Sequence, residues 1–325
     1  MSNQSVLITR SVPGALRERL EANFSVRSYD SEQPPARPEL FAMVTGQRGI
    51  VTMVSDLVDD QLLEAAGPAL AVVANYAVGY DNIDVEAATR RGVVVCNTPG
   101  VLSEATAELT IALLLALERR VVEGDRHLQD RAEWAWAPTW MLGRGLRGLR
   151  LGIIGLGRIG REVAKLAEAH GMAIAYARPS GPLEVPYLHL PLDELLETSD
   201  VVSVHCPLTD ETRHLIGADE LRRMRADAVI VNTARGAVID EKALASAVQT
   251  GEIAGAALDV YENEPAICEG LRGHPKVVLC PHLGSSTWAT RNAMERLAAE
   301  AVEAVLLEGR PPANALNPHV LAASC

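Results

Sequence analysis

The stretch "LRLGIIGLGRIGREVAKLAEAHG" (residues 149–171) decides the fold of this chain. An apolar strand precedes Gly155, Gly157 and Gly160, which have the spacing G-x-G-x-x-G, and an amphipathic helix follows them, with Gly171 placed to end it. Glycines in this context let the backbone turn sharply and approach a pyrophosphate, which then lies at the helix N-terminus. The alternative is a tight turn without a ligand, but the strand–turn–helix context favours a dinucleotide site.

Short apolar runs alternate with helix-like patterns on both sides of this stretch. Continuous β-branched runs separated by helices are typical of parallel sheets covered on both faces. The chain is therefore predicted to be α/β, with two parallel-sheet domains of Rossmann-like or flavodoxin-like build. Strands are predicted at residues 5–10, 49–55, 70–76, 92–98, 149–155, 172–177, 200–206, 227–233, 253–260 and 276–282.

Helical patterns lie between most of these strands, for example at 13–22 and 85–92, and again at 288–309. A long helix is predicted from an N-cap at Ser103 to about Glu123. The segment 133–148 breaks the alternation because it holds three tryptophans, a proline and several glycines, so we interpret it as an irregular connection. The tail at 310–320 is predicted to be a loop.

The composition is that of an ordinary soluble protein and argues against some partners. A length of 325 residues is typical of two domains, and 48% hydrophobic with 22% charged residues is typical of globular chains. The net charge of −12 argues against nucleic acid as a partner. The N-terminus lacks a signal-peptide layout and no apolar run is long enough to span a bilayer, so we expect no membrane partner.

The cysteines predict a reducing environment. They are odd in number and widely scattered, and no pair has the spacing of a metal site or a redox motif. We therefore expect no metal ion and a cytoplasmic location. The five positions are Cys96, Cys206, Cys268, Cys280 and Cys325.

The end of the strand at 172–177 bears on the choice of cofactor. A carboxylate for the ribose hydroxyls is expected about 20 residues beyond the first glycine, but the strand ends in Ala177 and Arg178 follows. Arg178 is interpreted as a clamp on a 2′-phosphate, with Ser180 adding a hydroxyl donor, whereas the alternative is a solvated loop residue. Arg158 is expected to face the pyrophosphate and Arg161 to point away. NADP(H) is thus the preferred cofactor, with NAD(H) as the second choice.

Three kinds of reactive side chain follow later strands. Arg235 follows one strand, Asp259 with Glu262 and Glu264 follows the next, and His282 follows the last. Because ligands of such sheets bind beyond the carboxyl ends of the strands, these groups are expected on the dinucleotide side. Reduction of a 2-oxo acid needs an arginine fork for the carboxylate, a histidine as proton donor, and a carboxylate that favours the imidazolium. Spacing alone leaves open which glutamate serves.

The chain resembles the D-isomer-specific 2-hydroxyacid dehydrogenase family, and within it the glyoxylate/hydroxypyruvate reductases. The resemblance covers nearly the whole chain, through "VVANYAVGYDNID", "GVVVCNTPGVL", "ATAELTIALLLA", "GIIGLGRIG", "VNTARGAVID", "AGAALDVYENEP" and "CPHLGSST". It implies a substrate domain at 1–99 and 289–325, split around a dinucleotide-binding domain at 100–288. It also implies that Arg235, Glu264 and His282 are catalytic and that Glu262 is a bystander.

The resemblance implies further site residues. The loop after the strand at 70–76 would offer the backbone N–H groups of Ala77, Val78 and Gly79 to the substrate carboxylate. In a homodimer, Trp140 would reach toward the neighbour's active site, unless the tryptophans only pack an interface. Asp259 resembles the aspartate that binds the nicotinamide amide. Cofactor contacts are expected at Gly155, Gly157, Arg158, Ile159, Gly160, Arg178, Ser180, Cys206, Pro207, Thr212, Thr233, Ala234, Asp259 and Gly284.

The predicted function is reduction of a small 2-oxo acid, glyoxylate or hydroxypyruvate, to the D-2-hydroxy acid by hydride transfer from NADPH, with His282 as proton donor. A broader D-2-hydroxyacid or 2-ketogluconate-type reductase on the same fold remains an alternative. A dinucleotide-sensing corepressor is an alternative of another class, although the three catalytic positions are intact. The substrate loop lacks the lysine that phosphite dehydrogenases place there.

Overall fold

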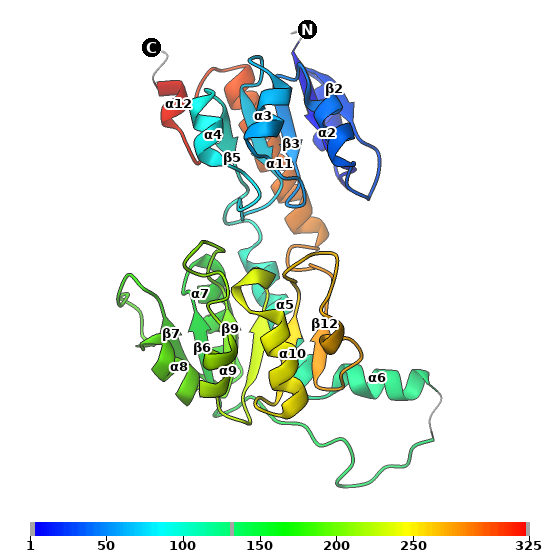
Figure 1. Cartoon of the computed structure of the whole chain (residues 1–325), viewed down its shortest axis with the longest axis vertical. Coiled ribbons are helices and arrows are strands. Elements are labelled where there is room, and N and C mark those ends of the chain that lie inside the picture. The colour runs from blue at the N-terminus through cyan, green and yellow to red at the C-terminus, as the bar shows by residue number, and fades with distance from the viewer. Residues whose placement is uncertain (1–3, 131–132, 323–325) are drawn as a thin grey trace. The chain divides into compact units, whose positions relative to one another are not determined.

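The computed structural model describes residues 4–130 and 133–322. The chain forms two compact units (Figure 1), which we call the first unit (Met1–Leu102 with Ser286–Cys325) and the second unit (Ser103–Ser285). Each unit is built on one parallel sheet covered by helices on both faces, which confirms the predicted fold class. The first unit is assembled from two chain segments, since the second unit is inserted between them.

The first unit has a five-stranded sheet with the order β2-β1-β3-β4-β5. Helices α2, α3 and α4 pack on one face, where Leu40, Leu62 and Ala87 meet apolar strand residues, while α1 and α11 pack together on the other. The strands are β1 (Ser5–Ile8), β2 (Ser25–Ser28), β3 (Gly49–Thr52), β4 (Val72–Asn75) and β5 (Val94–Cys96). The helices are α1 (Leu16–Glu21), α2 (Arg37–Val44), α3 (Asp60–Ala66), α4 (Val85–Arg90), α11 (Trp288–Leu306) and α12 (His319–Ala322).

The second unit has a seven-stranded sheet with the order β12-β11-β10-β9-β6-β7-β8. The chain starts in β6, builds outward to β8, and then returns to β9 on the other side, so the strand order reverses between β6 and β9. The strands are β6 (Arg150–Ile154), β7 (Ala173–Ala177), β8 (Leu188–His189), β9 (Val201–Val204), β10 (Val229–Asn232), β11 (Gly255–Leu258) and β12 (Val277–Leu279). Ligands of such sheets bind at the carboxyl ends beside this reversal.

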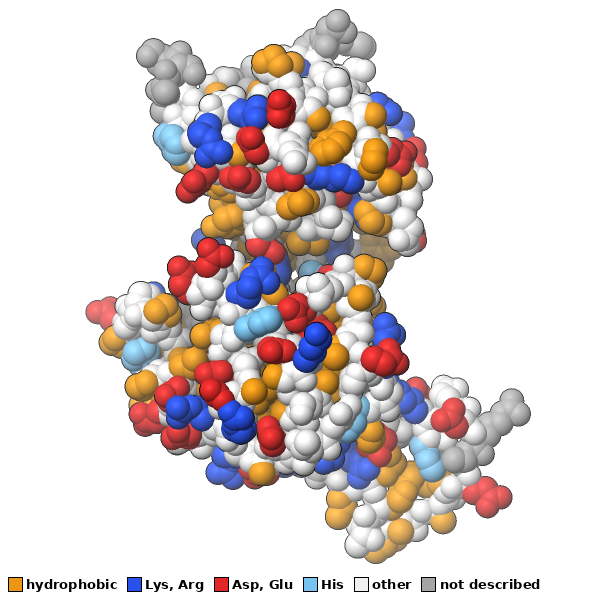
Figure 2. Space-filling view, viewed as in Figure 1, with side chains coloured by type: hydrophobic (Ala, Val, Ile, Leu, Met, Phe, Trp, Pro, Cys, Tyr) orange, Lys and Arg blue, Asp and Glu red, His pale blue; other side chains and the backbone are white. Residues whose placement is uncertain are grey.

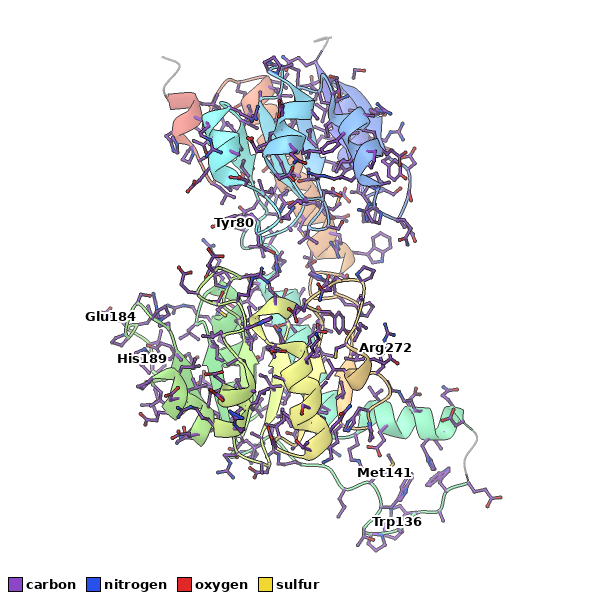
Figure 3. The ribbon with its side chains drawn as sticks, in the orientation of Figure 1. Tyr80, Trp136, Met141, Glu184, His189 and Arg272 are labelled. Carbon is purple, nitrogen blue, oxygen red and sulfur yellow. The ribbon has the colours of Figure 1, made fainter. Side chains whose placement is uncertain are left out.

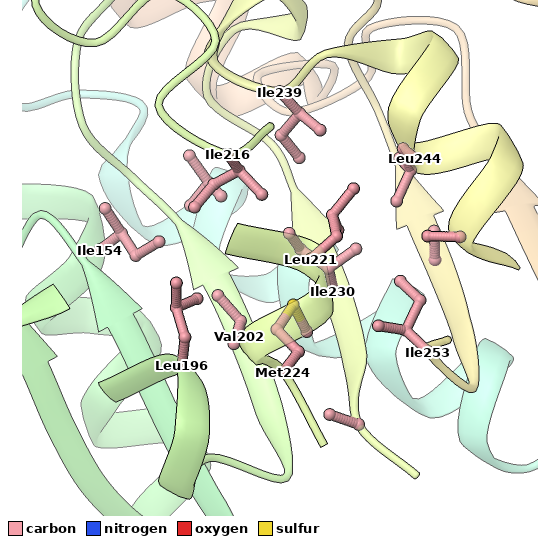
Figure 4. Close-up of a cluster of buried hydrophobic side chains, with 14 of the residues drawn as sticks. Ile154, Leu196, Val202, Ile216, Leu221, Met224, Ile230, Ile239, Leu244 and Ile253 are labelled. Carbon is pink, nitrogen blue, oxygen red and sulfur yellow. The ribbon is translucent and has the colours of Figure 1, made fainter. Parts of the chain in front are cut away.

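Both faces of the second sheet are buried, which explains its continuous apolar strands. In β9, Val202 and Val204 face the cluster drawn in Figure 4, which is covered by α8, α9 and α10, whereas Val201 faces α5 and α7. The helices are α5 (Ser103–Glu118), α6 (Val121–Gln129), α7 (Arg158–Ala169), α8 (Leu192–Thr198), α9 (Ala218–Arg223) and α10 (Glu241–Thr250). None of the helices in the described ranges combines the length and apolar character that crossing a membrane requires.

Two expectations about helices were wrong in detail. The predicted helix from Ser103 to Glu123 is two helices, because α5 ends at Glu118 and Arg120 takes a left-handed φ of 55° before α6. The break is stabilised locally, since the Arg120 guanidinium binds Glu123 and the Arg144 N–H binds the carbonyl of Glu118. Ser103 is the first helical residue, not the cap.

The tail at 310–320 is also not wholly a loop. Ala315 bridges to Cys96, the N–H of Leu316 donates to Val95, and α12 begins at His319. The buried Asn317 side chain explains this docking, because it binds the backbone of Val95 with its oxygen and that of Val93 with its nitrogen. The tail therefore runs along the edge of the first unit's sheet.

Candidate active site

The glycine turn after β6 has the geometry that a pyrophosphate needs. Gly155 has a φ of 92°, and a Cβ there would lie 2.8 Å from the N of Cys206. A Cβ on Gly160 would lie 2.5 Å from the carbonyl oxygen of Gly155, so α7 packs on β6 only with glycine at that position. A Cβ on Gly157 would meet nothing within 4 Å, and no side chain caps α7 there. Gly155 thus allows a tight turn, Gly160 a close contact between helix and strand, and Gly157 an open approach to the helix N-terminus. Together these features fit the binding of a dinucleotide.

The adenosine side of such a site would lie where β7 ends. The strand ends at Ala177, as predicted, and the Arg178 Nε donates to Ser180 Oγ over 2.9 Å. The loop that follows is held by the buried Tyr176, whose hydroxyl accepts the N–H of Leu183 at 2.7 Å. Figure 3 labels Glu184 farther along this loop, where it is exposed. Arg178 is therefore the charged residue directly at the strand end.

Other predicted cofactor positions lie in the loops after β9 and β10 and at the start of α7. Cys206, in the loop after β9, lies against Gly155, and Thr212 holds this loop by donating its hydroxyl to the carbonyl of Pro207 at 2.7 Å. Thr233 shares a hydrogen bond of 2.8 Å with Thr110 of α5, so its hydroxyl already has a partner. The remaining positions are Arg158, exposed at the start of α7, Ile159, half-buried against the core, and Ala234, whose N–H donates to Asn232.

His282 and Glu264 form a close pair. His282 Nδ1 lies 2.9 Å from Glu264 Oε2, and Glu264 Oε1 accepts the N–H of Tyr261 at 3.0 Å. Burial opposes ionisation of Glu264, but the hydrogen bond and charge of His282, the Tyr261 N–H and the charge of Arg235 outweigh it and lower the pKa of Glu264. Glu264 is thus a carboxylate that favours a positive charge on the imidazole beside it.

Asp259 fixes the turn that carries His282. His282 has a left-handed φ of 57°, which is uncommon for a residue other than glycine. The carbonyl of Asp259 accepts the N–H of His282, and its two carboxylate oxygens accept the N–H groups of Leu283 and Gly284 at 2.7 and 2.8 Å. Burial raises the pKa of Asp259, although these two N–H groups act in the opposite direction. The sequence suggested only a cofactor contact for Asp259, so this anchoring role was missed.

Arg235 is brought to the same place by its neighbours. The side chain of Asn232 at the end of β10 accepts the N–H of Ala234 and donates to the carbonyl of Arg235. A Cβ on Gly236 would lie 1.8 Å from the carbonyl carbon of Tyr261, so glycine lets this turn pack against the turn before Glu264. Asn232 and Gly236 were not singled out from the sequence. Their effect is to group Arg235, Glu264 and His282, which follow three adjacent strands.

The two glutamates of this turn have different partners. Glu262 lies 2.8 Å from Nε2 of His214, and its N–H donates to Glu241. Glu264 instead contacts His282. In the part of the chain that the structure describes, the second unit therefore contains two histidine–glutamate pairs, and the charge of Arg235 acts on the carboxylate of the Glu264–His282 pair.

The loop after β4 belongs to the first unit. Ala77, Val78 and Gly79 are half-buried, and Figure 3 labels Tyr80, which follows them. Among the described residues, the N–H groups of these three residues donate to no protein acceptor. Free N–H groups in sequence are what an anion-binding loop offers.

Trp140 lies on an arm of the second unit, described at residues 121–130 and 133–142, that follows α5. Figure 2 shows hydrophobic side chains on this arm, and Figure 3 labels Trp136 and Met141 on it. The Trp140 ring stacks on Trp134 with centroids 5.8 Å apart. The arm returns through Arg144, which contacts the carbonyl of Asp200 just before β9. Trp140 therefore lies toward the amino ends of the strands, away from the ends that carry His282.

Comparison with known proteins gives consistent matches. Residues 111–284 match the family described as D-isomer specific 2-hydroxyacid dehydrogenase, NAD binding domain. The chain is 44% identical over 327 residues to a glyoxylate reductase of Thermococcus litoralis, with 98% of each chain covered. A crystal structure of an NADPH-dependent glyoxylate/hydroxypyruvate reductase of Sinorhizobium meliloti, in complex with NADP and malonate, has a TM-score of 0.85 and 34% identity, with 97% of each chain covered. The crystal structure of a protein from Thermus thermophilus has a TM-score of 0.90 and 43% identity, covering 96% of this chain and 100% of its own.

Proposed function

The chain belongs to the D-isomer-specific 2-hydroxyacid dehydrogenase family, and we propose that it reduces glyoxylate or hydroxypyruvate to the D-2-hydroxy acid with NADPH. The observation that carries this proposal is the grouping of Arg235, Glu264 and His282 at the carboxyl ends of three adjacent strands, in the same unit as the glycine turn. The names of the similar proteins support the substrate class.

His282 is the proposed proton donor. When bound, the dinucleotide would supply the hydride for the carbonyl carbon of the substrate. His282 Nδ1 faces Glu264, which leaves Nε2 to give its proton to the carbonyl oxygen, and the neutral imidazole then regains a proton from solvent. Glu264 stays ionised, because its pKa is lowered, and so favours the imidazolium that begins the step.

The substrate carboxylate is proposed to bind to Arg235 and to the N–H groups of Ala77, Val78 and Gly79. A guanidinium binds a carboxylate with two parallel hydrogen bonds, which orients the adjoining carbonyl. In this proposal the first unit is the substrate domain and the second unit is the dinucleotide-binding domain.

NADP(H) is the proposed cofactor, with NAD(H) as the weaker one. The glycine turn would hold the pyrophosphate, while Arg178 and Ser180 would bind the 2′-phosphate. Ala177 supports this preference, because a carboxylate at that position would repel the phosphate. The Asp259 carboxylate is proposed to accept a hydrogen bond from the nicotinamide amide, in addition to holding the turn that carries His282.

Glu264→Gln is expected to move the pH profile of reduction to lower pH. Glu264 is a carboxylate with a lowered pKa whose negative charge supports the proton-donating imidazole, and the neutral amide lacks that charge, so reduction is expected to slow at a lower pH than in wild type. The measurement is kcat against pH for both proteins. Glu262→Gln is the matched control, since its carboxylate pairs with His214. Coincident profiles for wild type and Glu264→Gln would contradict the proposed pairing.

We also infer that the protein is a homodimer in which the arm contacts the second copy. Trp136 is 80% exposed and Leu142 66% exposed, and exposed apolar groups gathered on one segment are typical of an interface. Because Trp140 lies toward the amino ends of its own strands, the neighbour's site is the one it could line.

Trp140→Ala is expected to leave the dimer intact and to change the ratio of kcat/KM for hydroxypyruvate over glyoxylate by roughly tenfold, the effect of losing a pocket contact. Light scattering gives the assembly and initial rates give the ratio. Trp136→Ala is the control for substrate preference, because the exposed Trp136 is assigned to the interface and not to the pocket. A monomeric wild-type protein would contradict the inference at once.

Initial rates on a panel of 2-oxo acids test the proposed substrate. Glyoxylate, hydroxypyruvate, pyruvate and 2-ketogluconate are compared at saturating NADPH. We expect the highest kcat/KM for glyoxylate or hydroxypyruvate. A preference for 2-ketogluconate would instead place the protein with the broader reductases of the same family.

A further inference from the structure

The structure assigns Asn97 and Asn75 a role in binding the substrate carboxylate, as positioning residues that hold the loop after β4 in an anion-binding shape. This inference rests on the proposed function, because the anion is taken to be the substrate. Both side chains contact the loop through its backbone carbonyls.

Three consecutive carbonyl oxygens of the loop are held from within the first unit. The carbonyl of Ala77 accepts the N–H of Thr98 at 2.9 Å. The carbonyl of Val78 accepts Asn97 Nδ2 at 2.7 Å, and that of Gly79 accepts Asn75 Nδ2 at 2.9 Å. The carbonyl oxygens of Ala77, Val78 and Gly79 thus all accept hydrogen bonds, while the N–H groups of the same three residues have no partner among the described residues.

Because each peptide group is planar, a hydrogen bond that fixes a loop carbonyl also fixes the direction of the next residue's N–H. In a trans peptide the C=O of one residue and the N–H of the next point in opposite directions. By holding the carbonyl of Val78, Asn97 therefore sets the direction of the Gly79 N–H. By holding the carbonyl of Gly79, Asn75 sets the direction of the Tyr80 N–H. Each asparagine thus directs one N–H away from the core of the unit.

Both asparagines are themselves fixed. Asn75 is buried, and its Oδ1 accepts the hydroxyl of Thr52 at 3.1 Å. Asn97 is 7% exposed, and its main-chain carbonyl accepts a hydrogen bond from Asn314 Nδ2 at 2.6 Å. The docked tail thus supports the substrate loop through Asn97. Donors held in advance bind an anion without first having to be ordered.

The ligand that suits this loop is a carboxylate. Several backbone N–H groups in sequence form a concave site for an anion, and their hydrogen bonds to a charged oxygen are stronger than neutral ones. These groups act on the carboxylate and not on the carbonyl that is reduced. The asparagines should therefore affect KM and leave kcat largely unchanged.

Asn97→Ala and Asn97→Asp test the inference. Both variants remove the side-chain N–H that donates to the carbonyl of Val78, and the aspartate also places a negative charge next to that carbonyl. We expect KM for glyoxylate to rise by about 10- to 100-fold, the effect of losing a hydrogen bond to a charged group, with little change in kcat. The dissociation constant of oxalate, measured by calorimetry with NADPH bound, should rise in parallel, while that of NADPH should not.

Cys96→Ala is the matched control. Cys96 is a fully buried neighbour at the end of β5, so its truncation disturbs the same place without touching the loop carbonyls. Its KM and oxalate affinity should match wild type. If Asn97→Asp does not fold, the neutral Asn97→Ala variant decides. Unchanged KM and oxalate affinity in a folded Asn97→Ala protein, or a fall in kcat alone, would overturn the inference.

The two proposals can fail separately. If wild type does not reduce glyoxylate but binds oxalate, and Asn97→Ala weakens oxalate binding, the loop is an anion site positioned by Asn97 and only the proposed reaction is wrong. If wild type reduces glyoxylate and the Asn97 variants behave like wild type, the reaction stands and the positioning role is wrong.

Discussion

His282→Ala is expected to lower kcat for glyoxylate reduction by about 10²- to 10⁴-fold, the contribution usually attributed to general acid catalysis. Without the imidazole, no group paired with Glu264 remains to protonate the carbonyl oxygen. The dissociation constant of NADPH should change little, because the glycine turn that would hold the pyrophosphate follows a different strand. Steady-state rates and a fluorescence titration of NADPH give the two quantities.

The second histidine–glutamate pair supplies the control for this variant. His214 contacts Glu262 at 2.8 Å, a separation close to the 2.9 Å between His282 and Glu264, but the charge of Arg235 acts on Glu264 of the His282 pair. His214→Ala is expected to retain most of the wild-type kcat. A His282→Ala protein with near wild-type kcat, or equal losses in the two variants, would contradict the assignment of His282 as proton donor.

Arg178→Ala is expected to raise KM for NADPH by about 10- to 100-fold, as the loss of a charge-assisted hydrogen bond predicts, and to leave KM for NADH nearly unchanged. The reason is that only NADPH carries the 2′-phosphate that the Arg178–Ser180 pair would bind. Ala177→Asp should have the larger effect, since a carboxylate repels the phosphate and offers NADH a partner for its ribose hydroxyls.

The cofactor variants are compared by kcat/KM for both cofactors. Arg161→Ala is the matched control, because this exposed arginine lies farther along α7. Binding of 2′,5′-ADP, measured by calorimetry, isolates the adenosine side from the chemistry. A wild-type preference for NADH, or equal losses with both cofactors in Arg178→Ala, would show that Arg178 is only a loop residue.

Local patterns explain what could be predicted from the sequence. The glycine spacing follows from the tight turn at Gly155 and from the contact of Gly160 with the Gly155 carbonyl, and the continuous apolar strands follow from burial on both faces. The strands β2 and β8 were missed because they are short and carry polar or exposed residues, which leaves no apolar run to recognise. The end of α5 was missed because Arg144, distant in sequence, binds its last carbonyl.

Contacts between distant segments explain what could not be predicted. Glu262 and Glu264 both follow β11 within a few residues, so their positions in the sequence do not show which one acts. Their partners distinguish them, because Glu262 contacts His214 and Glu264 contacts His282. Likewise, nothing in the pattern around Asn97 reveals that its amide meets the carbonyl of Val78, because that contact depends on how β4 and β5 lie side by side.

The central claim is that this protein turns over a 2-oxo acid, and the most direct test is the rate at which purified wild-type protein consumes NADPH when glyoxylate is added. We predict saturable consumption with kcat/KM within the usual enzyme range of about 10⁴ to 10⁸ M⁻¹s⁻¹, glycolate formed in equimolar amount, and a lower kcat/KM with NADH. Tight binding of NADPH without turnover on glyoxylate or any other 2-oxo acid of the panel would contradict the claim, and would indicate a protein that senses the dinucleotide instead.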